Sequence, residues 1–375
     1  MTFPVVLKDA ENDDLLSRKG AKTQRFISSF CQNSSIDPRF HNIKNIRLLD
    51  SDYRITKVVW AKSMRIGIFG TGGVGGYFGG RLARAGEDVT FIARGEHLGA
   101  IKTHGLRVDS SDGDFVIYPA KATDNVGEVG ETELVILGVK AWQVPDAARA
   151  IKPIVGPKTT VVPLQNGVDA VPQLVDELGA ENVIGGLCRI VSFVVGPGHI
   201  RHAGFTPSII IGELDNRRSE RIETIEQVFK HAGLDATIAA DIQVALWTKF
   251  LFIASFSGVG AVADAPAGVL RSDPKWRAQM LSAMEEIYAL AHARGVKLPP
   301  DSVAKVMAAI DALPEDATSS MQRDIAAGKP SELESQNGSV VRMARESCVD
   351  VPTHTLIYET LTRKSLRVND SWRKR

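Results

Sequence analysis

The chain has 375 residues, of which 44% are hydrophobic and 24% charged, and its formal net charge at pH 7 is +1. This near-neutral balance excludes electrostatic binding to nucleic acid or to an anionic membrane as the basis of function. The three cysteines, Cys31, Cys188 and Cys348, are scattered and form no CxxC pair. They predict neither a disulfide framework nor a metal site and are typical of a reducing compartment, so we expect a cytoplasmic protein.

Residues 1–63 are polar, show no helical or strand period, and end just before a second methionine, Met64. They lack the continuous apolar core of a secretory signal, so we expect no export. Their excess of Lys and Arg with several serines is typical of an organellar transit peptide, but the acidic cluster at 9–14 argues against one. We expect a poorly ordered extension, or an upstream start codon added to a protein that begins at Met64.

An apolar run at 66–69 leads directly into a glycine-rich turn, and a helix-compatible run follows. This order predicts a strand, a tight turn and a helix. Gly70 supplies an unusual backbone conformation, Gly72 has no side chain where a pyrophosphate would approach, and Gly75 permits close helix–strand packing. The helix N-terminus would face the phosphates. The predicted cofactor contacts of the turn are Gly70, Thr71, Gly72, Gly73, Val74 and Gly75.

Further apolar runs recur at the spacing of β–α units. Predicted strands cover 87–94, 133–140, 159–166, 182–187 and 208–213, and helices between them cover 144–154 and 170–178. Strands that alternate with helices predict a mostly parallel sheet covered on both faces. We expect 208–213 to be the last strand, paired with one near 192–195.

Polar residues end three of these strands, at the edge where an α/β sheet binds its ligand. Arg94 lies 19 residues beyond Gly75, where NAD-binding proteins carry an acidic residue for the ribose 2′-hydroxyl. An arginine binds a 2′-phosphate instead, so NADP(H) is predicted, the alternative being a solvated surface arginine. Lys140 and Asn166 would contact cofactor or substrate, or else serve the turns, since Asn-Gly is a common turn pair.

After residue 238 the strand pattern ends and helical periodicity dominates. Predicted helices cover 241–256, 275–294, 300–312 and 332–347, with breaks at Pro266, Pro274, Pro299, Pro300 and Pro314. The longest uncharged apolar stretch, at 250–263, is 14 residues long, shorter than the ~20 that span a bilayer, and predicts a buried helix. We therefore predict an α/β Rossmann-type domain over 64–238 and an all-helical domain over 239–375, with the active site in the cleft between them.

Lys249 is a lone cation on a helix that is otherwise apolar, with no carboxylate between Asp241 and Asp264. A buried lysine needs a partner or a lowered pKa. It either extends to the surface or donates a proton to a carbonyl oxygen while hydride reaches the adjacent carbon. Farther along the chain, Ser319 or Ser320 would cap a helix, and Glu332 would lie in a first helical turn.

Together these features resemble the ketopantoate reductase (2-dehydropantoate 2-reductase) family, over residue 64 to about residue 363. The motifs that carry the resemblance are GTGGVGG at 70–76, FIARGEHL at 91–98, VKAWQV at 139–144, LQNG at 164–167, LWTKF at 246–250, SSMQRDI at 319–325 and SELESQNG at 331–338. The resemblance implies a C-terminal domain like that of 6-phosphogluconate dehydrogenase. It also implies an oxidoreductase that uses NADPH to reduce a 2-oxo acid, above all 2-dehydropantoate to pantoate in pantothenate and coenzyme A synthesis.

The resemblance further implies roles for individual residues. Lys249 corresponds to the proton donor, and Glu332 to a catalytic glutamate near the nicotinamide ribose and the substrate hydroxyl. Asn166 would lie between nicotinamide and substrate, and Ser320 would contact the substrate. Further cofactor contacts are implied for Arg94 at the 2′-phosphate, Lys140, Asn166, Glu332 and a position near Val191.

Three positions depart from the best-known members, which carry asparagines where this chain has Ile253, Ser257 and Ala267. Isoleucine and alanine side chains neither donate nor accept hydrogen bonds, so a polar substrate group left unpaired there would lose about 1–3 kcal/mol. A different, more apolar 2-oxo acid or ketone, contacting Ile253 and Ser257, therefore competes with 2-dehydropantoate. A nonenzymatic NADPH sensor is a third hypothesis, which Lys249 and Glu332 disfavour. A homodimer stays open, and no nucleic-acid or membrane partner is expected.

Overall fold

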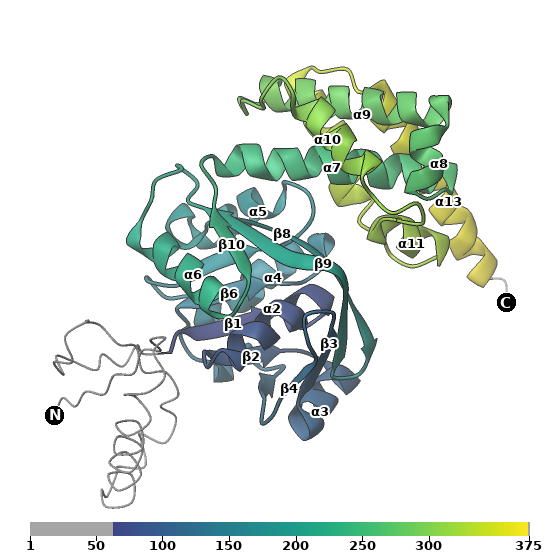
Figure 1. Cartoon of the computed structure of the whole chain (residues 1–375). Coiled ribbons are helices and arrows are strands. Elements are labelled where there is room, and N and C mark those ends of the chain that lie inside the picture. Colours follow the sequence, from purple (N-terminus) through teal and green to yellow (C-terminus); the bar gives the residue numbers. More distant parts are fainter. Residues whose placement is uncertain (1–62, 374–375) are drawn as a thin grey trace, which may run out of the picture. The chain divides into compact units, whose positions relative to one another are not determined.

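A computed structural model gives the fold of residues 63–373, with the surroundings of side chains described as far as residue 364. Met64–Arg375 form one structural unit, in which a sheet region is followed by a helical region (Figure 1). The extension predicted at 1–63 lies outside the described residues, except for Ser63.

The first sheet is parallel throughout, and its central strand leads into the glycine turn. Its strands, in spatial order, are β5 (Lys121–Thr123), β2 (Asp88–Ile92), β1 (Arg65–Phe69), β6 (Leu134–Leu137) and β7 (Thr160–Pro163). Phe69 lies beside Ile92 and Leu137, and Leu137 lies beside Pro163. Because these residues end their strands, the segments that follow them meet at one edge of the sheet. The predicted parallel sheet is confirmed for the runs at 66–69, 87–94, 133–140 and 159–166, whereas β5 was not predicted and the run at 182–187 leads into a strand of a second sheet.

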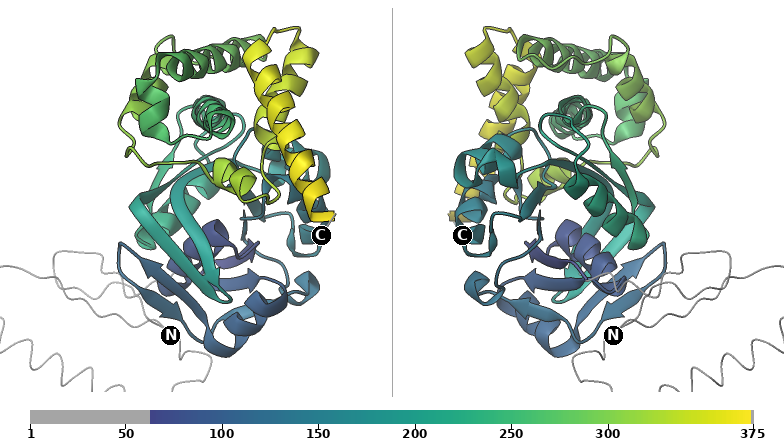
Figure 2. Two further views of the ribbon diagram at one scale, coloured as in Figure 1. Left: turned by 90° about the vertical axis from the view of Figure 1, so that its right-hand side faces the viewer. Right: turned by 90° about the vertical axis from the view of Figure 1, so that its left-hand side faces the viewer.

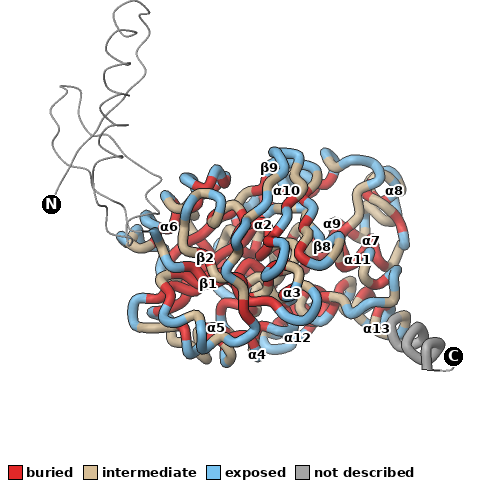
Figure 3. The backbone as a smooth tube through the Cα atoms, turned by 90° about the horizontal axis from the view of Figure 1, so that it is seen from below, coloured by how far each residue is buried: buried red, intermediate tan, exposed pale blue. Residues whose placement is uncertain are grey.

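Alternate residues of these strands pack against helices on opposite faces of the sheet. Ile68 belongs to one core with Leu82, whereas Phe69 belongs to another with Ala148 and Leu174. The helices of this region are α2 (Gly73–Arg84), α3 (Gly95–His104), α4 (Val144–Ile151), α5 (Ala170–Leu178) and α6 (Glu220–His231). Figure 3 shows the buried residues gathered in the interior of the sheet region, with exposed residues along the outer turns.

A second, mixed sheet lies beside the first and was not predicted. Its strands are β3 (Leu106–Ser110), β4 (Phe115–Ile117), β8 (Gly185–Gly196), β9 (His199–Gly212) and β10 (Asp235–Ile238). They follow the order β10-β9-β3-β4, and β8 pairs antiparallel with β9. The short strands β3, β4 and β10 are too weakly patterned to stand out from loops in the sequence.

Two details of the strand prediction were wrong. The last strand of the sheet region is β10, and not the run at 208–213. That run pairs with the start of β8, since Ser208 lies beside Arg189, whereas Ser192 pairs with His202. The reason is the tight turn between β8 and β9, which places residues close in sequence opposite one another and so fixes the register of the whole hairpin.

The helical region is built around α7 (Ile242–Ala263), which Figure 2 shows end-on with later helices around it. Phe250, Leu251 and Ala254 of α7 share one core with Met284 and Ile310. The remaining helices are α8 (Ala267–Ser272), α9 (Pro274–Ala293), α10 (Ser302–Asp311), α11 (Ser320–Ala326), α12 (Ser339–Ser347) and α13 (Pro352–Arg373). The all-helical character predicted after residue 238 is confirmed.

Two features of the helical region differ from the expected pattern. The helix expected over 332–347 begins with a π-helical turn at Glu334–Gly338, and regular α-helix starts only with α12. Among the described residues, α7 is the helix that is long and apolar enough to cross a membrane by length and composition, but 67% of its most apolar window is buried inside the protein. The buried helix predicted at 250–263 is confirmed as the second half of α7.

Candidate active site

The glycine turn connects β1 to α2 and meets the steric requirements expected from its sequence. Gly70 has a φ of +93°, and a Cβ there would lie 2.7 Å from the Val139 nitrogen. A Cβ on Gly75 would overlap the Gly70 carbonyl oxygen, whereas one on Gly72 would have no described atom within 4 Å. Within the described residues no side chain caps the N-terminus of α2. This cradle, with free N–H groups and room above Gly72, fits the pyrophosphate of a dinucleotide.

Thr71 and Val74 support the turn from the protein side. The Thr71 hydroxyl donates to the Ile92 carbonyl at 3.1 Å, and the Val74 side chain packs against the core of the sheet region. His97 also fixes the turn: its Nδ1 accepts the Gly198 N–H at 3.0 Å, which leaves the ring proton on Nε2 to donate to the Thr71 carbonyl at 2.7 Å. Burial lowers the pKa of His97, in keeping with this neutral ring.

The backbone of β8 passes beside the start of α2. A Cβ on Gly73 would lie 2.7 Å from the carbonyl carbon of Ser192 and 2.9 Å from the nitrogen of Phe193. Val191, the position suggested by the resemblance, is one residue away, and 38% of it is exposed. The structure therefore places Ser192 and Phe193 nearest the glycine turn.

Arg94 and Lys140 follow the ends of β2 and β6, at the same edge as the turn. Arg94 is exposed and occupies the N-cap position of α3. The Lys140 ammonium lies 3.2 Å from the Asp324 carboxylate of α11 and 5.8 Å from the centre of the Trp142 ring. This ion pair joins the sheet edge to the helical region. Asp324 was missed by sequence reasoning, although it lies within the SSMQRDI motif.

Glu332 hydrogen-bonds to one other predicted site residue, Asn166. Its side chain is buried, with 6% of the residue exposed. One carboxylate oxygen accepts hydrogen bonds from the Asn166 amide at 3.1 Å and the Gln336 amide at 3.3 Å. The other accepts from the Ala141 N–H at 3.4 Å. The carboxylate is therefore held by the loop after β7, the turn after β6 and the π-helical turn that follows Glu332.

Lys249 lies half-buried in the first half of α7. Among the described residues, its ammonium forms no ion pair or hydrogen bond with another side chain. Burial raises the pKa of the neighbouring Cys188 thiol, and the charge of Lys249 offsets part of this rise. A half-buried ammonium without a carboxylate partner is available to a ligand.

Ile253 and Ser257 follow Lys249 at four-residue intervals, so the three side chains lie along one face of α7. Ile253 is partly buried against the helical core. Ser257 is 0% exposed, and its Oγ has no hydrogen-bond partner in the described part of the chain. Ala267, at the start of α8, is also fully buried.

Ser319, and not Ser320, caps α11. The Ser319 hydroxyl accepts the Gln322 N–H at 3.1 Å, so Ser320, the first residue of the helix, keeps its own hydroxyl for other contacts. This settles the choice between the two serines that the sequence left open.

No metal centre accompanies these residues: in residues 63–364, no group of three or more His, Cys, Asp or Glu side chains could hold a metal ion. A pocket of about 340 Å³ lies at the opposite, amino-terminal ends of β1, β2 and β5, and it shares no residue with the candidate site.

Two family models match the chain in succession. "Ketopantoate reductase PanE/ApbA" matches residues 66–216, and "Ketopantoate reductase PanE/ApbA C terminal" matches residues 241–365. The chain belongs to the ketopantoate reductase family. Members of this family are oxidoreductases that act on a CH–OH group, which makes the chain an NAD(P)-dependent oxidoreductase of 2-oxo acids.

Individual relatives agree with this assignment. A 2-dehydropantoate 2-reductase from Mesorhizobium japonicum is 32% identical over 78% of this chain and 94% of its own length. The crystal structure of a PanE/ApbA family ketopantoate reductase from Ralstonia eutropha JMP134 has a TM-score of 0.75 and 30% identity, covering 82% of this chain and 100% of its own. D-mandelate dehydrogenase, solved with NADH and anilino(oxo)acetate, has the same TM-score and coverage at 22% identity, which shows a shared fold alone.

Proposed function

We propose that this protein uses NADPH to reduce 2-dehydropantoate to pantoate, with Lys249 as the proton donor. The observation that carries the proposal is the buried Glu332 carboxylate, which the Asn166 amide binds at the edge of the sheet that bears the glycine turn. Binding of a nucleotide alone requires neither this carboxylate nor an unpaired lysine on α7. Their presence supports reduction over a nonenzymatic NADPH sensor.

The cofactor would bind along the carboxyl edge of the parallel sheet. The N–H groups at the start of α2 would bind the pyrophosphate above Gly72, and the exposed Arg94 would bind the 2′-phosphate with its planar fork of donors. The nicotinamide, when bound, supplies the hydride. Asn166 would lie between the nicotinamide and the substrate. Glu332, which is hydrogen-bonded to Asn166, would contact the nicotinamide ribose and the substrate hydroxyl.

Lys249 would act on the oxygen of the substrate carbonyl. Its ammonium stabilises the negative charge that develops on this oxygen and then transfers a proton to it. With no carboxylate bound to it among the described residues, the ammonium is free to do both. The alternative that Lys249 only extends to the surface is disfavoured because the residue is half-buried on a helix at the centre of the helical region.

One observation favours a second substrate class, a 2-oxo acid with a more apolar tail. Beyond Lys249, the same face of α7 presents Ile253, which packs against apolar side chains, and then the enclosed Ser257. An apolar group beside Ile253 would gain burial, whereas a hydroxyl there would lose its hydrogen bonds with water.

The test is to follow NADPH oxidation by the full chain with 2-dehydropantoate and with a panel of 2-oxo acids that carry branched or aromatic tails. The proposal expects 2-dehydropantoate to have the highest kcat/KM. A higher value for the apolar acids would establish the second class instead. NADPH binding without turnover of any 2-oxo acid would refute reduction and support the sensor.

A further inference from the structure

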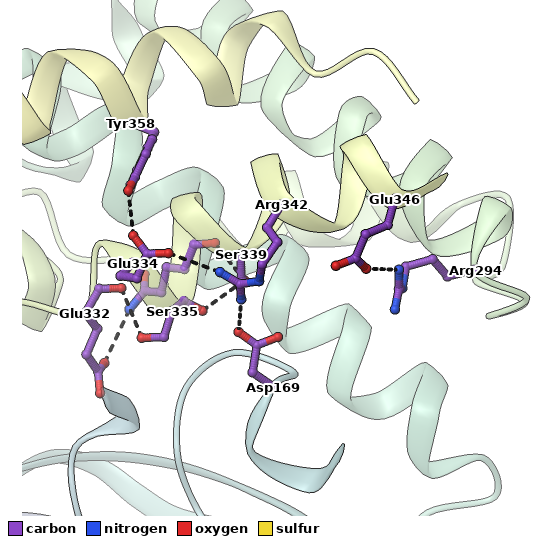
Figure 4. A network of polar contacts seen from close by, with 10 residues as sticks. Asp169, Arg294, Glu332, Glu334, Ser335, Ser339, Arg342, Glu346 and Tyr358 are labelled. Carbon is purple, nitrogen blue, oxygen red and sulfur yellow. Dashed lines mark hydrogen bonds and ion pairs between the residues drawn. The ribbon is translucent and has the colours of Figure 1, made fainter. Parts of the chain in front are cut away.

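A network of ion pairs connects two segments that carry site residues (Figure 4). Arg342 of α12 is at its centre: one guanidinium nitrogen lies 2.6 Å from the Asp169 carboxylate, and another lies 3.0 Å from the Glu334 carboxylate. The Tyr358 hydroxyl of α13 donates to the second oxygen of Glu334 at 2.5 Å. The guanidinium thus bridges two carboxylates that come from distant parts of the chain.

Both carboxylates lie close in sequence to residues of the candidate site. Asp169 occupies the N-cap position of α5, three residues after Asn166, and Glu334 begins the π-helical turn two residues after Glu332. The two segments also touch directly. Gly167 has a φ of +95°, and a Cβ there would lie 2.7 Å from the Ser335 carbonyl oxygen. Arg342 therefore spans the same junction that the Asn166–Glu332 hydrogen bond crosses.

The π-helical turn has internal hydrogen bonds that keep its shape. The Gly338 N–H donates to the Leu333 carbonyl at 2.9 Å, which closes the wide turn. The Ser339 hydroxyl lies 3.1 Å from the carbonyl oxygens of both Ser335 and Gln336. These contacts fix the turn internally but do not fix its distance from the loop after β7. That distance depends on the groups that cross the junction.

We propose that Arg342 is a positioning residue, which holds the loop of Asn166 against the turn of Glu332 and thereby keeps their hydrogen bond in register. The inference rests on the proposed function for its kinetic consequence. A single exposed ion pair usually contributes little to stability. Here the planar fork bridges two carboxylates at once, and a lysine, which is a point charge on a flexible stem, cannot reproduce that geometry.

The test compares R342M and R342K with a matched control, D311N. The control removes one carboxylate of the Arg277–Asp311 ion pair between α9 and α10, which has its own bidentate geometry and contacts no site residue. Hydrogen exchange is measured in the segments 164–169 and 332–338, together with kcat/KM. We expect R342M to raise exchange in both segments and to lower kcat/KM roughly 10- to 100-fold, as a small misplacement of reacting groups does. R342K should recover part of each effect, and D311N should show neither.

A double-mutant cycle shows whether Arg342 acts through Glu332. In an E332Q background, R342M should cost little further activity, because the group that it positions has already lost its charge. An unchanged exchange pattern in R342M, or the same fold-loss in both backgrounds, would overturn the inference. If the parent protein reduces no 2-oxo acid, the proposed function fails. The role of Arg342 is then still decided by two measurements on the same variants, hydrogen exchange and the NADPH dissociation constant.

Discussion

The two sides of the candidate site differ in the groups that form them: backbone on the sheet side and side chains on the helical side. On the sheet side, the phosphate cradle consists of backbone: glycines, the N-terminus of α2 and the passing strand β8. On the helical side, the groups proposed to react are side chains: Lys249 of α7, Ser320 of α11 and Glu332, which precedes the π-helical turn. We therefore expect cofactor binding to depend on the shape of the turn, and turnover to depend on the charge and position of a few functional groups.

Replacement of Lys249 should have the largest effect on activity, and it should affect turnover without affecting cofactor binding. K249A is expected to lower kcat roughly 10²- to 10⁴-fold, the range for loss of a general acid, and to leave the NADPH dissociation constant unchanged. Steady-state kinetics and fluorescence titration with NADPH measure the two quantities. K305A, at an exposed lysine of α10, is the control and should change neither. Turnover at the parental rate in K249A would remove the assigned role.

Arg94 tests whether the cofactor side distinguishes NADPH from NADH. Loss of charge-assisted hydrogen bonds to a 2′-phosphate costs about 1.5–3 kcal/mol, so R94Q should raise KM for NADPH roughly 10- to 100-fold and leave KM for NADH nearly unchanged. K102A, an exposed cation of the same helix α3, serves as the control. An equal rise for both cofactors would contradict selection of NADP(H) by Arg94.

Gly72 tests whether shape alone governs the phosphate cradle. A Cβ at Gly72 meets no described atom, and the φ of −80° suits alanine, so G72A should fold with an unchanged Tm. The new methyl group would occupy the space proposed for the pyrophosphate. It should raise the NADPH dissociation constant about tenfold, which is a loss of about 1.4 kcal/mol in binding free energy. G99A, an equally unobstructed glycine of α3, is the matched control. Identical NADPH affinity in G72A would place the phosphates elsewhere.

His97 should give the smallest effect, on the pH dependence of stability. Burial lowers the pKa of His97 below its ordinary value of 6.5, so below that pH the unfolded chain binds a proton that the folded chain does not. The stability contributed by neutral His97 is complete above pH 6.5 and is lost as the pH falls below it. Urea unfolding across this range should show the decline, and H97Q should flatten it. A slope unchanged in H97Q would assign the decline to other groups, such as the buried His354, whose pKa burial also lowers.

The strand, glycine turn and helix on the cofactor side were largely predictable because their requirements are local. Gly70 and Gly75 meet the steric requirements that their spacing predicts, Gly72 has open space beside it, and α5 has the predicted bounds of 170–178. A strand, a tight turn and a helix are consecutive in the chain, so periodicity and glycine spacing are enough to identify them. The cofactor contact implied near Val191 stays a prediction; in the structure the next residues of β8, Ser192 and Phe193, lie beside Gly73.

On the substrate side, the sequence named candidate residues, whose roles stay predictions, but it did not indicate their connections. The resemblance supplied Lys249, Asn166 and Glu332, but no spacing in the sequence indicates that Glu332 would bind Asn166, 166 residues earlier. The roles of Asp324 and Arg342 were missed for the same reason, since each pairs with a residue of the sheet region. Such pairs depend on how α11 and α12 pack, which local propensity does not determine.

By itself, the sequence determined the parallel sheet, the glycine turn at its edge, the helical character after residue 238 and the family. These follow from interactions between residues that are near one another in the chain, and from motifs that keep their order. Only the tertiary structure decided that a second sheet supports the turn, that Ser319 caps α11, and that the Glu332 carboxylate is buried among three N–H donors. Those outcomes depend on long-range packing, because a buried carboxylate is stable only where distant segments bring it hydrogen-bond donors.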